Sequence, residues 1–384
     1  MGEADGSGVA RRLLLTCALL ALVPVAGAAA SPAGQKSWAT PQIRLVTTAG
    51  LMGASDVASF RPDDPLTAQA LENLVFDLMQ RVAPPEELQP TPIGPTDSTG
   101  ATTTVPTTTI ADTVPSAPKQ VADPTRPVTL AQLDARLVSA LGLSQSASTF
   151  ARNARAAGLK VPSRFGTEVV ARLLGLRLNH PASQDSLELL PNDAATRAEA
   201  AYSAAQILGF DGFSVENVQS LADAFVLPDL TDWQKRILTT AVARIGMPYI
   251  WGGTSDGAQT EFGVGSRGGY DCSGFVWRVY KLQPYADEGT LASVLRGRTT
   301  YQMSGEVPRS KRIGLAALQP ADVVFFGDKG PRSKPAQVGH TGIYLGSGWF
   351  IHSSEYGVAV ARLDGWYARE FAWARRPLAE AGLS

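Results

Sequence analysis

The sequence predicts an α+β domain in its C-terminal half, with helices packed on an antiparallel sheet, and a helical region before it. Three observations support this fold class. Apolar residues recur at spacings of three and four over much of residues 44–225, which is typical of amphipathic helices. From residue 230 onward glycine is frequent, and six of the seven tryptophans occur there. Within residues 230–378 helical stretches come first and short β-type runs follow.

The first 30 residues predict a signal peptide that is removed on export. Arg11 and Arg12 precede an apolar run, Leu13–Val25, and small residues follow it. The run is too short to span a bilayer, and no later segment is long and apolar enough to do so. Its removal takes Cys17 with it, so the exported chain keeps only Cys272, which cannot form an internal disulfide. We therefore expect a secreted protein with a free thiol.

The composition excludes a nucleic-acid-binding face. Only 18% of the residues are charged and the net charge is −1, so no basic surface is expected. Residues 91–118 form a separate low-complexity stretch with ten threonines and five prolines. Such a stretch buries too little apolar surface to offset its ordering entropy. It predicts either a linker or an insertion within the helical region.

Three segments of the helical region share one pattern: a turn with proline, a threonine, and an amphipathic stretch. The threonines are Thr67, Thr129 and Thr196, and threonine is a favoured N-cap residue. Gln132 and Glu199 lie three residues after the second and third of them, so we expect a capping box at both. The pattern predicts either repeated helical units or three ordinary capped helices of unrelated origin.

The C-terminal region predicts two helices followed by strands. The helices are expected at Trp233–Ile245 and Cys272–Tyr280, and the β-type runs are Val323–Phe326, Gly342–Leu345 and Trp349–Ile351. A Gly-Ser-Gly turn at 346–348 separates the last two runs and predicts a hairpin. His340 and His352 border this hairpin, so their imidazoles are expected on neighbouring strands. The third histidine, His180, is expected in a surface turn.

Cys272 has the sequence context of a nucleophile. An ordinary thiol has a pKa of about 8.5, so it carries little thiolate at neutral pH. A helix N-terminus and a nearby imidazolium both lower that pKa, and Cys272 opens a predicted helix. We expect His340 to pair with the thiolate and act as general base and then acid, and His352 to fix its tautomer. The backbone N–H of Cys272 is a candidate oxyanion donor.

Five motifs follow one another in the C-terminal region. They are Tyr249-Ile250-Trp251-Gly252-Gly253, Asp271-Cys272-Ser273-Gly274-Phe275, Asp322-Val323-Val324-Phe325-Phe326, His340-Thr341-Gly342-Ile343-Tyr344-Leu345-Gly346 and Ile351-His352. Together, from about Trp233 to Arg376, they resemble the NlpC/p60 family of papain-like cysteine peptidases of bacterial cell walls. The resemblance implies that Cys272 is the nucleophile, His340 the base and His352 the third, orienting residue.

The same resemblance implies a substrate and a cleft. The expected activity is hydrolysis of amide bonds in peptidoglycan stem peptides, between D-glutamyl and a diamino acid, without a cofactor. The implied cleft residues are Tyr249, Trp251, Asp271 and Ser273, and Asp271 is expected to meet a substrate amino group. The sequence departs from the family pattern at three places, none of which removes a catalytic group: Thr254–Tyr270 and Lys281–Thr300 are longer than usual, and Ala321 stands where the family usually has glycine. The two longer stretches are expected to reshape the cleft.

The turn, threonine and helix units resemble the S-layer homology module, whose helical repeats bind secondary cell-wall polymers. The resemblance covers Arg44 to Phe210; it is close at Phe60–Thr67 and Pro191–Glu199 and weak between them. It implies that the N-terminal half tethers the protein to the envelope through a polysaccharide. The expected location is therefore outside the cell, associated with the wall.

Plainer interpretations of the same residues stay open. Cys272 can be a buried apolar residue, and both histidines can serve packing or, with the cysteine, bind zinc. Tyr249 and Trp251 can be core aromatics, and Asp271 can be only a helix cap or can serve as cap and cleft residue together. Two other functions also fit: an N-acetylmuramoyl-L-alanine amidase or transferase on the same scaffold, and a non-catalytic wall-binding protein.

Overall fold

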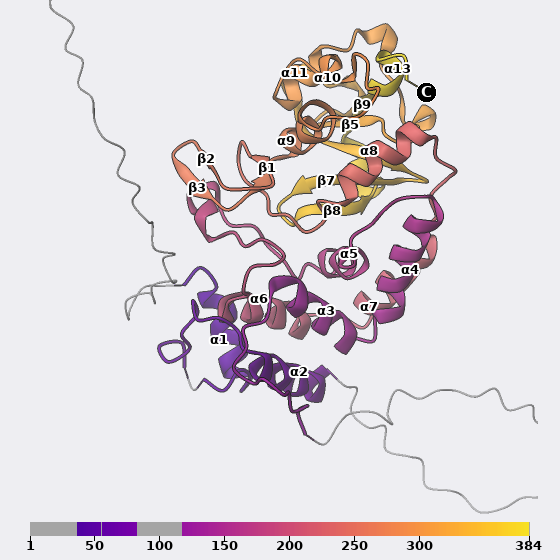
Figure 1. Ribbon diagram of the computed structural model, residues 1–384. Coiled ribbons are helices and arrows are strands. Elements are labelled where there is room, and N and C mark those ends of the chain that lie inside the picture. The colour runs from indigo at the N-terminus through magenta and orange to yellow at the C-terminus, as the bar shows by residue number, and fades with distance from the viewer. Residues whose placement is uncertain (1–36, 55, 83–116, 384) are drawn as a thin grey trace, which may run out of the picture. The chain divides into compact units, whose positions relative to one another are not determined.

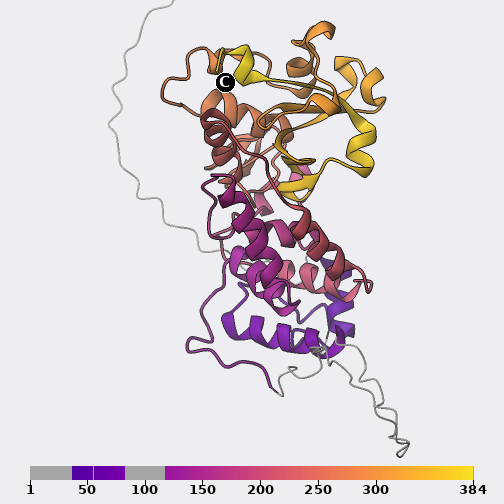
Figure 2. The same ribbon diagram turned by 90° about the vertical axis from the view of Figure 1, so that its right-hand side faces the viewer.

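The computed structural model describes residues 37–54, 56–82 and 117–383, and Figures 1 and 2 show it in two views. The predicted signal peptide, with Cys17, and nearly all of the threonine- and proline-rich stretch lie outside these residues. The described residues all belong to one compact unit. Within the described part of the chain, no helix has the length and apolar character needed to cross a membrane.

The N-terminal part of this unit consists of helices. They are α1 (Thr40–Thr48), α2 (Ala68–Val82), α3 (Leu130–Ala140), α4 (Ser144–Ala156), α5 (Phe165–Leu173), the 3-10 helix η2 (Ala182–Leu187), α6 (Arg197–Leu208) and α7 (Ser214–Ala224). Thr129 and Gln132 form the expected capping box at α3. Thr196 accepts from the Glu199 backbone N–H at α6, but the expected reciprocal bond is absent. The Glu199 carboxylate instead accepts from Arg177, 2.9 Å away.

The three capped segments meet at the residues just before their helices begin. The backbone N–H of Leu66 donates to Ala195, that of Ala195 donates to Val128, and that of Val128 donates back to Leu66, at 2.8, 2.9 and 3.0 Å. All three residues are buried. The three segments are therefore equivalent in position, and a closed ring of hydrogen bonds joins them.

The C-terminal part combines short helices with one main sheet. Its helices are α8 (Asp232–Val242), α9 (Cys272–Trp277) with the π-helical turn η3 (Arg278–Leu282), α10 (Leu291–Val294), α11 (Thr300–Gly305), α12 (Gly365–Glu370) and α13 (Pro377–Glu380), and four 3-10 turns, η4 (Arg309–Lys311), η5 (Leu315–Ala317), η6 (Gly330–Arg332) and η7 (Pro335–Gln337). Its strands are β1 (Thr254–Ser255), β2 (Gln259–Glu261), β3 (Val264–Ser266), β4 (Gly269–Tyr270), β5 (Val323–Gly327), β6 (Val338–Gly346), β7 (Trp349–Ser354), β8 (Gly357–Arg362) and β9 (Phe371–Arg375). The main sheet is antiparallel in the order β8-β7-β6-β5-β9, and β1–β4 and β2–β3 form two small pairs. The predicted α+β architecture and the β6–β7 hairpin are both present.

Both faces of the main sheet are covered. Val323 and Phe325 of β5 face the large apolar core, on the side where α8 and α9 contact β6 (Figure 1). Val324 and Phe326 alternate with them and face a smaller cluster, against which Tyr367 of α12 packs. This alternation is the period-two pattern of a strand. It fixes which residues of β6 and β7 face α9 and which face α12.

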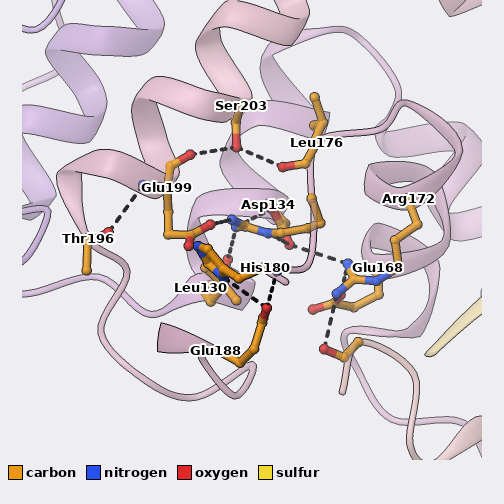
Figure 3. Close-up of polar contacts among 12 residues, drawn as sticks. Leu130, Asp134, Glu168, Arg172, Leu176, His180, Glu188, Thr196, Glu199 and Ser203 are labelled. Carbon is orange, nitrogen blue, oxygen red and sulfur yellow. Dashed lines mark hydrogen bonds and ion pairs between the residues drawn. The ribbon is translucent and has the colours of Figure 1, made fainter. Parts of the chain in front are cut away.

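A buried charge cluster lies where the helices meet the C-terminal part (Figure 3). Arg177 donates to both oxygens of Asp134, at 3.1 and 2.6 Å, and to Glu199. Arg172 pairs with Glu168 at 2.6 Å and donates to the backbone oxygen of Gly246 at 3.1 Å. Buried charges persist in proteins when they are paired in this way. The cluster therefore joins α3, α5 and α6 to the first residues of the C-terminal part.

Candidate active site

Cys272 is the first residue of α9, as the sequence predicts, and its side chain is buried. Asp271 caps this helix by accepting from the Gly274 backbone N–H. The backbone N–H groups of Ser273 and Thr341 both contact the sulfur and favour the thiolate. Thr341 belongs to β6 and directly follows His340. The thiol therefore lies between the start of α9 and the strand that carries the first histidine.

His340 and His352 form a pair across β6 and β7. Their Nε2 and Nδ1 atoms, respectively, are 2.8 Å apart, and their rings are nearly perpendicular, at 82°. Both rings lie beside the smaller cluster that contains Phe326 and packs against Tyr367. The ring centroids of Phe326 and His340 are 5.7 Å apart, and those of Tyr367 and His352 are 5.3 Å apart. This packing fixes the orientation of both imidazoles. In the described residues, no hydrogen bond joins Cys272 to either ring.

The pKa shifts of Cys272 and His340 favour a neutral thiol and a neutral imidazole over the expected ion pair. Burial raises the pKa of the Cys272 thiol to about 12, and the Asp271 charge adds to that effect, while the Ser273 and Thr341 N–H groups and Arg298 oppose it. Burial lowers the pKa of His340 to about 4. The expectation of a depressed thiol pKa is therefore wrong for this structure, because burial outweighs the helix N-terminus.

Asp271 is the centre of a polar network rather than a free carboxylate. One oxygen accepts from the Gly274 N–H and from the Ser273 hydroxyl, the latter at 3.0 Å. The other accepts from the Gly252 N–H at 3.0 Å. Arg298 donates to both oxygens, at 3.1 Å each, and also to the Ser273 hydroxyl at 2.7 Å. Asp271 therefore caps the helix, which leaves a second role in the cleft untested, and Ser273 shares its network.

Arg298 extends this network to the loop that contains Gly252 and Gly253, called the glycine loop below. Its guanidinium also donates to the backbone oxygens of Gly252 and Gly253, at 2.8 and 3.2 Å. One side chain therefore connects that loop to the start of the Cys272 helix. Sequence reasoning missed Arg298, which lies in the longer stretch before α11. Its only signal was that unusual length.

The predicted cleft residues Tyr249 and Trp251 lie beside this network. Burial raises the pKa of Tyr249, and the charges of Cys272 and Asp271 add to the rise. Trp251 is 56% exposed, so the alternative that it is a core aromatic is wrong. The helical part holds both residues: Asn179 donates to the Tyr249 backbone oxygen at 2.9 Å, and Asp185 accepts from the Trp251 N–H at 3.3 Å.

His180 takes no part in this site, but it is not a surface residue either. Its side chain is buried, with Nδ1 2.9 Å from Glu188 and the ring 4.5 Å from that of Trp38. The expected surface turn is wrong because Glu188, eight residues away, and Trp38, far away in the sequence, cover the ring. As to metals, the described residues contain no group of three or more His, Cys, Asp or Glu side chains suited to hold an ion.

Comparisons with known proteins find similarity in the C-terminal part. Residues 246–376 match the model of the NlpC/P60 family. The probable peptidoglycan endopeptidase LytE of Bacillus subtilis is 33% identical over 132 residues, which are 34% of this chain and 30% of that protein. The gamma-D-glutamyl-L-lysine dipeptidyl-peptidase of Bacillus cereus is 34% identical over 150 residues, 37% of this chain and 36% of that protein. The chain thus covers only about a third of the length of these relatives.

Among solved structures, an NlpC/P60 family protein from Bacillus cereus is 26% identical and is covered to 43%, against 40% of this chain, with a TM-score of 0.29. The family match begins at Gly246, where the buried charge cluster reaches the C-terminal part, and ends at Arg376, just after β9. It includes the Cys272 helix and the two histidine strands. The C-terminal region of this chain is an NlpC/P60 family domain.

Proposed function

We propose that this chain is a secreted cell-wall hydrolase that cleaves amide bonds in peptidoglycan stem peptides. One observation carries the proposal: a buried thiol at the start of α9 contacts the backbone beside His340, whose ring is paired with His352 at 2.8 Å. The family match and the endopeptidase names of the similar proteins support the same reaction class. In this proposal Cys272 is the nucleophile, His340 the base and His352 the orienting residue.

The proposed reaction starts from a neutral thiol and a neutral imidazole. As the sulfur of Cys272 attacks the substrate carbonyl, its proton passes to His340, and the backbone N–H of Cys272 donates to the developing oxyanion. His340 then gives this proton to the leaving amine as the C–N bond breaks. Water, deprotonated by His340, attacks the thioester and releases the acid and the thiol. His352 holds the ring of His340 in one tautomer throughout.

We propose the bond between D-glutamyl and a diamino acid as the target. The name of the Bacillus cereus relative, a gamma-D-glutamyl-L-lysine dipeptidyl-peptidase, supports this choice. Tyr249, Trp251, Asp271 and Ser273 are the proposed cleft residues. Because the Asp271 carboxylate is engaged by Arg298 and by backbone N–H groups, a substrate amino group would have to share it with these donors.

The products of digestion test the proposal. Purified full-length protein should release fragments cut within the stem peptide from isolated peptidoglycan, identified by mass spectrometry, and Cys272→Ala should release none. Free lactyl ends without stem cleavage would replace the endopeptidase by an amidase. A wild-type protein that binds peptidoglycan but releases nothing would leave only a wall-binding protein.

We also propose that the helical part tethers the enzyme to a wall polysaccharide. The ring formed by Leu66, Val128 and Ala195 supports a set of three related units, as the S-layer homology resemblance implies. Because Arg172 and Asn179 bind the C-terminal part, deleting these helices would disturb both parts. The test is therefore co-sedimentation of full-length Cys272→Ala with cell walls before and after chemical removal of the secondary polysaccharide. Unchanged sedimentation after removal would refute the tether.

A further inference from the structure

Asn179 connects the helical part to two segments of the C-terminal part. Its side-chain amide donates to the backbone oxygen of Tyr249 at 2.9 Å, and its backbone N–H donates to the backbone oxygen of Glu355 at 2.7 Å. Asn179 itself is partly buried and lies between α5 and η2, outside any helix. One residue of the helical part therefore joins two segments that are distant from each other in the sequence.

The bond to Tyr249 leads to the start of the Cys272 helix. Tyr249 opens the segment 249–253, which is bonded to Asp271 at two points. The Gly252 N–H donates to the carboxylate of Asp271 at 3.0 Å, and the Gly253 oxygen accepts from its backbone N–H at 3.2 Å. Because Asp271 caps α9, the position of the Tyr249 segment affects the position of the thiol.

The bond to Glu355 leads to the strand that carries the second histidine. Glu355 directly follows β7, and His352 lies on that strand. Between them, Ser353 is fully buried, and its hydroxyl donates to the backbone oxygen of Tyr270 at 2.6 Å. Asn179 therefore bonds to the cysteine side of the proposed cleft through its side chain and to the histidine side through its backbone.

Buried charges hold the neighbours of Asn179 in place. Arg177, two residues earlier, is only 5% exposed and forms ion pairs with two buried carboxylates. His180, the next residue, donates its backbone N–H to Glu188, and its Nδ1 lies 2.9 Å from the same carboxylate (Figure 3). Side chains that are supported in this way hold a precise geometry. Asn179 thus presents its amide to Tyr249 from a fixed position.

We propose that Asn179 is a positioning residue of the active site, an inference that rests on the proposed function. It holds the Tyr249 segment against the Cys272 helix while its backbone holds the turn after the histidine strand. Reacting groups must be kept close to their productive geometry, and small displacements lower the rate. The helical part is therefore needed for the cleavage of stem peptides, in addition to its proposed role as a tether.

Three substitutions in the full-length protein test this role. Asn179→Ala removes the amide that donates to Tyr249 but keeps the backbone bond to Glu355. Asn179→Leu also removes the donor, while it keeps the size of the side chain and adds no charge. Asn153→Ala is the matched control, because the Asn153 amide makes a bond of the same kind, to the Phe225 backbone oxygen at 2.8 Å within the helical part.

The first measurement is iodoacetamide alkylation of Cys272, followed by mass spectrometry, which needs no catalytic activity. Burial is the main reason for the raised pKa of the thiol, so a displaced Tyr249 segment should expose it and move the alkylation profile to lower pH. At a fixed pH both Asn179 variants should react roughly two- to tenfold faster than wild type, the equivalent of one ordinary hydrogen bond. Asn153→Ala should react at the wild-type rate.

These rates are compared under conditions in which urea unfolding shows every variant to be folded. Wild-type alkylation in both Asn179 variants, or equal acceleration in Asn153→Ala, would overturn the proposal. The second measurement is hydrolysis of a sugar-free stem peptide, for which kcat/KM should fall roughly two- to tenfold in the Asn179 variants and stay unchanged in the control. A wild type that cleaves nothing, with the expected alkylation pattern intact, would refute only the hydrolase.

Discussion

Arg298 donates hydrogen bonds to both carboxylate oxygens of Asp271, at 3.1 Å each. The same carboxylate caps the helix that begins with Cys272, and the same guanidinium donates to the Gly252 and Gly253 backbone oxygens. The pair therefore sets the position of the thiol relative to the glycine loop. The Arg298–Asp271 pair also sets the charge environment of the thiol, since Asp271 raises the pKa of Cys272 and Arg298 lowers it.

Replacing Arg298 should impair both the position and the ionisation of the thiol. Arg298→Gln removes hydrogen bonds to a charged group, which are worth roughly 1.5–3 kcal/mol of stability. It also removes a positive charge, so the thiol pKa should rise and iodoacetamide alkylation of Cys272 should shift to higher pH. Arg298→Lys should not restore the wild type, because one ammonium cannot reproduce the planar, forked contacts.

A matched control and a double variant separate charge from structure. Arg296→Gln changes a nearby exposed arginine and should alter neither stability nor the alkylation profile. In Arg298→Gln with Asp271→Asn both opposing charges are lost, so the alkylation profile should return toward wild type. A double variant whose profile shifts further than that of Arg298→Gln would contradict the charge role.

The neutral state of the site predicts an unusual pH dependence. With a Cys272 pKa of about 12, the alkylation rate should rise roughly tenfold per pH unit through pH 7–10, without a plateau. Hydrolysis requires neutral His340, whose pKa is about 4, so activity should be lost only as the pH falls toward 4. Stopped-flow alkylation and initial rates would measure both. An alkylation plateau near pH 5–8 that disappears in His340→Ala would indicate an ion pair and contradict this prediction.

The features of this site that depend on residues close in sequence were predicted, whereas those that depend on contacts between distant residues were not. The β6–β7 hairpin and the cap at α9 follow from residues close in sequence, so the pattern was sufficient to locate Cys272, His340 and His352. Burial of the thiol and of His180 depends on residues far away in the chain, and so does the contact between Arg298 and Asp271. The sequence pattern carries no record of such contacts, which explains why the direction of the thiol pKa shift was wrong.

The buried charge cluster should make a large contribution to stability. Arg177→Met would leave Asp134 and Glu199 buried without their main partner, and removing one member of a buried pair costs roughly 3–5 kcal/mol. Arg61→Met is the control, because Arg61 is largely exposed and pairs only with Asp64, a contact worth under about 1 kcal/mol. Urea unfolding of both variants would measure the difference. Equal losses of unfolding free energy in the two variants would show that the buried cluster contributes no more to stability than an exposed ion pair.

Asp185 should make the stability of the chain depend on pH. Burial raises its pKa to about 6, with Glu188 adding to the rise and the Trp251 N–H and His180 opposing it. Because the folded pKa exceeds the unfolded value of 3.8, the folded state binds this proton more tightly. Stability from this group is therefore fully present below about pH 4 and is lost as the pH rises through 6.

Asp185→Asn removes this titration and keeps an oxygen that can accept from the Trp251 N–H. At pH 7 the variant should therefore be more stable than wild type, by on the order of 1 kcal/mol, since one pKa unit corresponds to about 1.4 kcal/mol and solvent screening reduces it. At pH 4 the two proteins should unfold together. Thermal unfolding at both pH values measures the difference. A variant less stable than wild type at pH 7 would show that the charged carboxylate, rather than its cost, dominates at this contact.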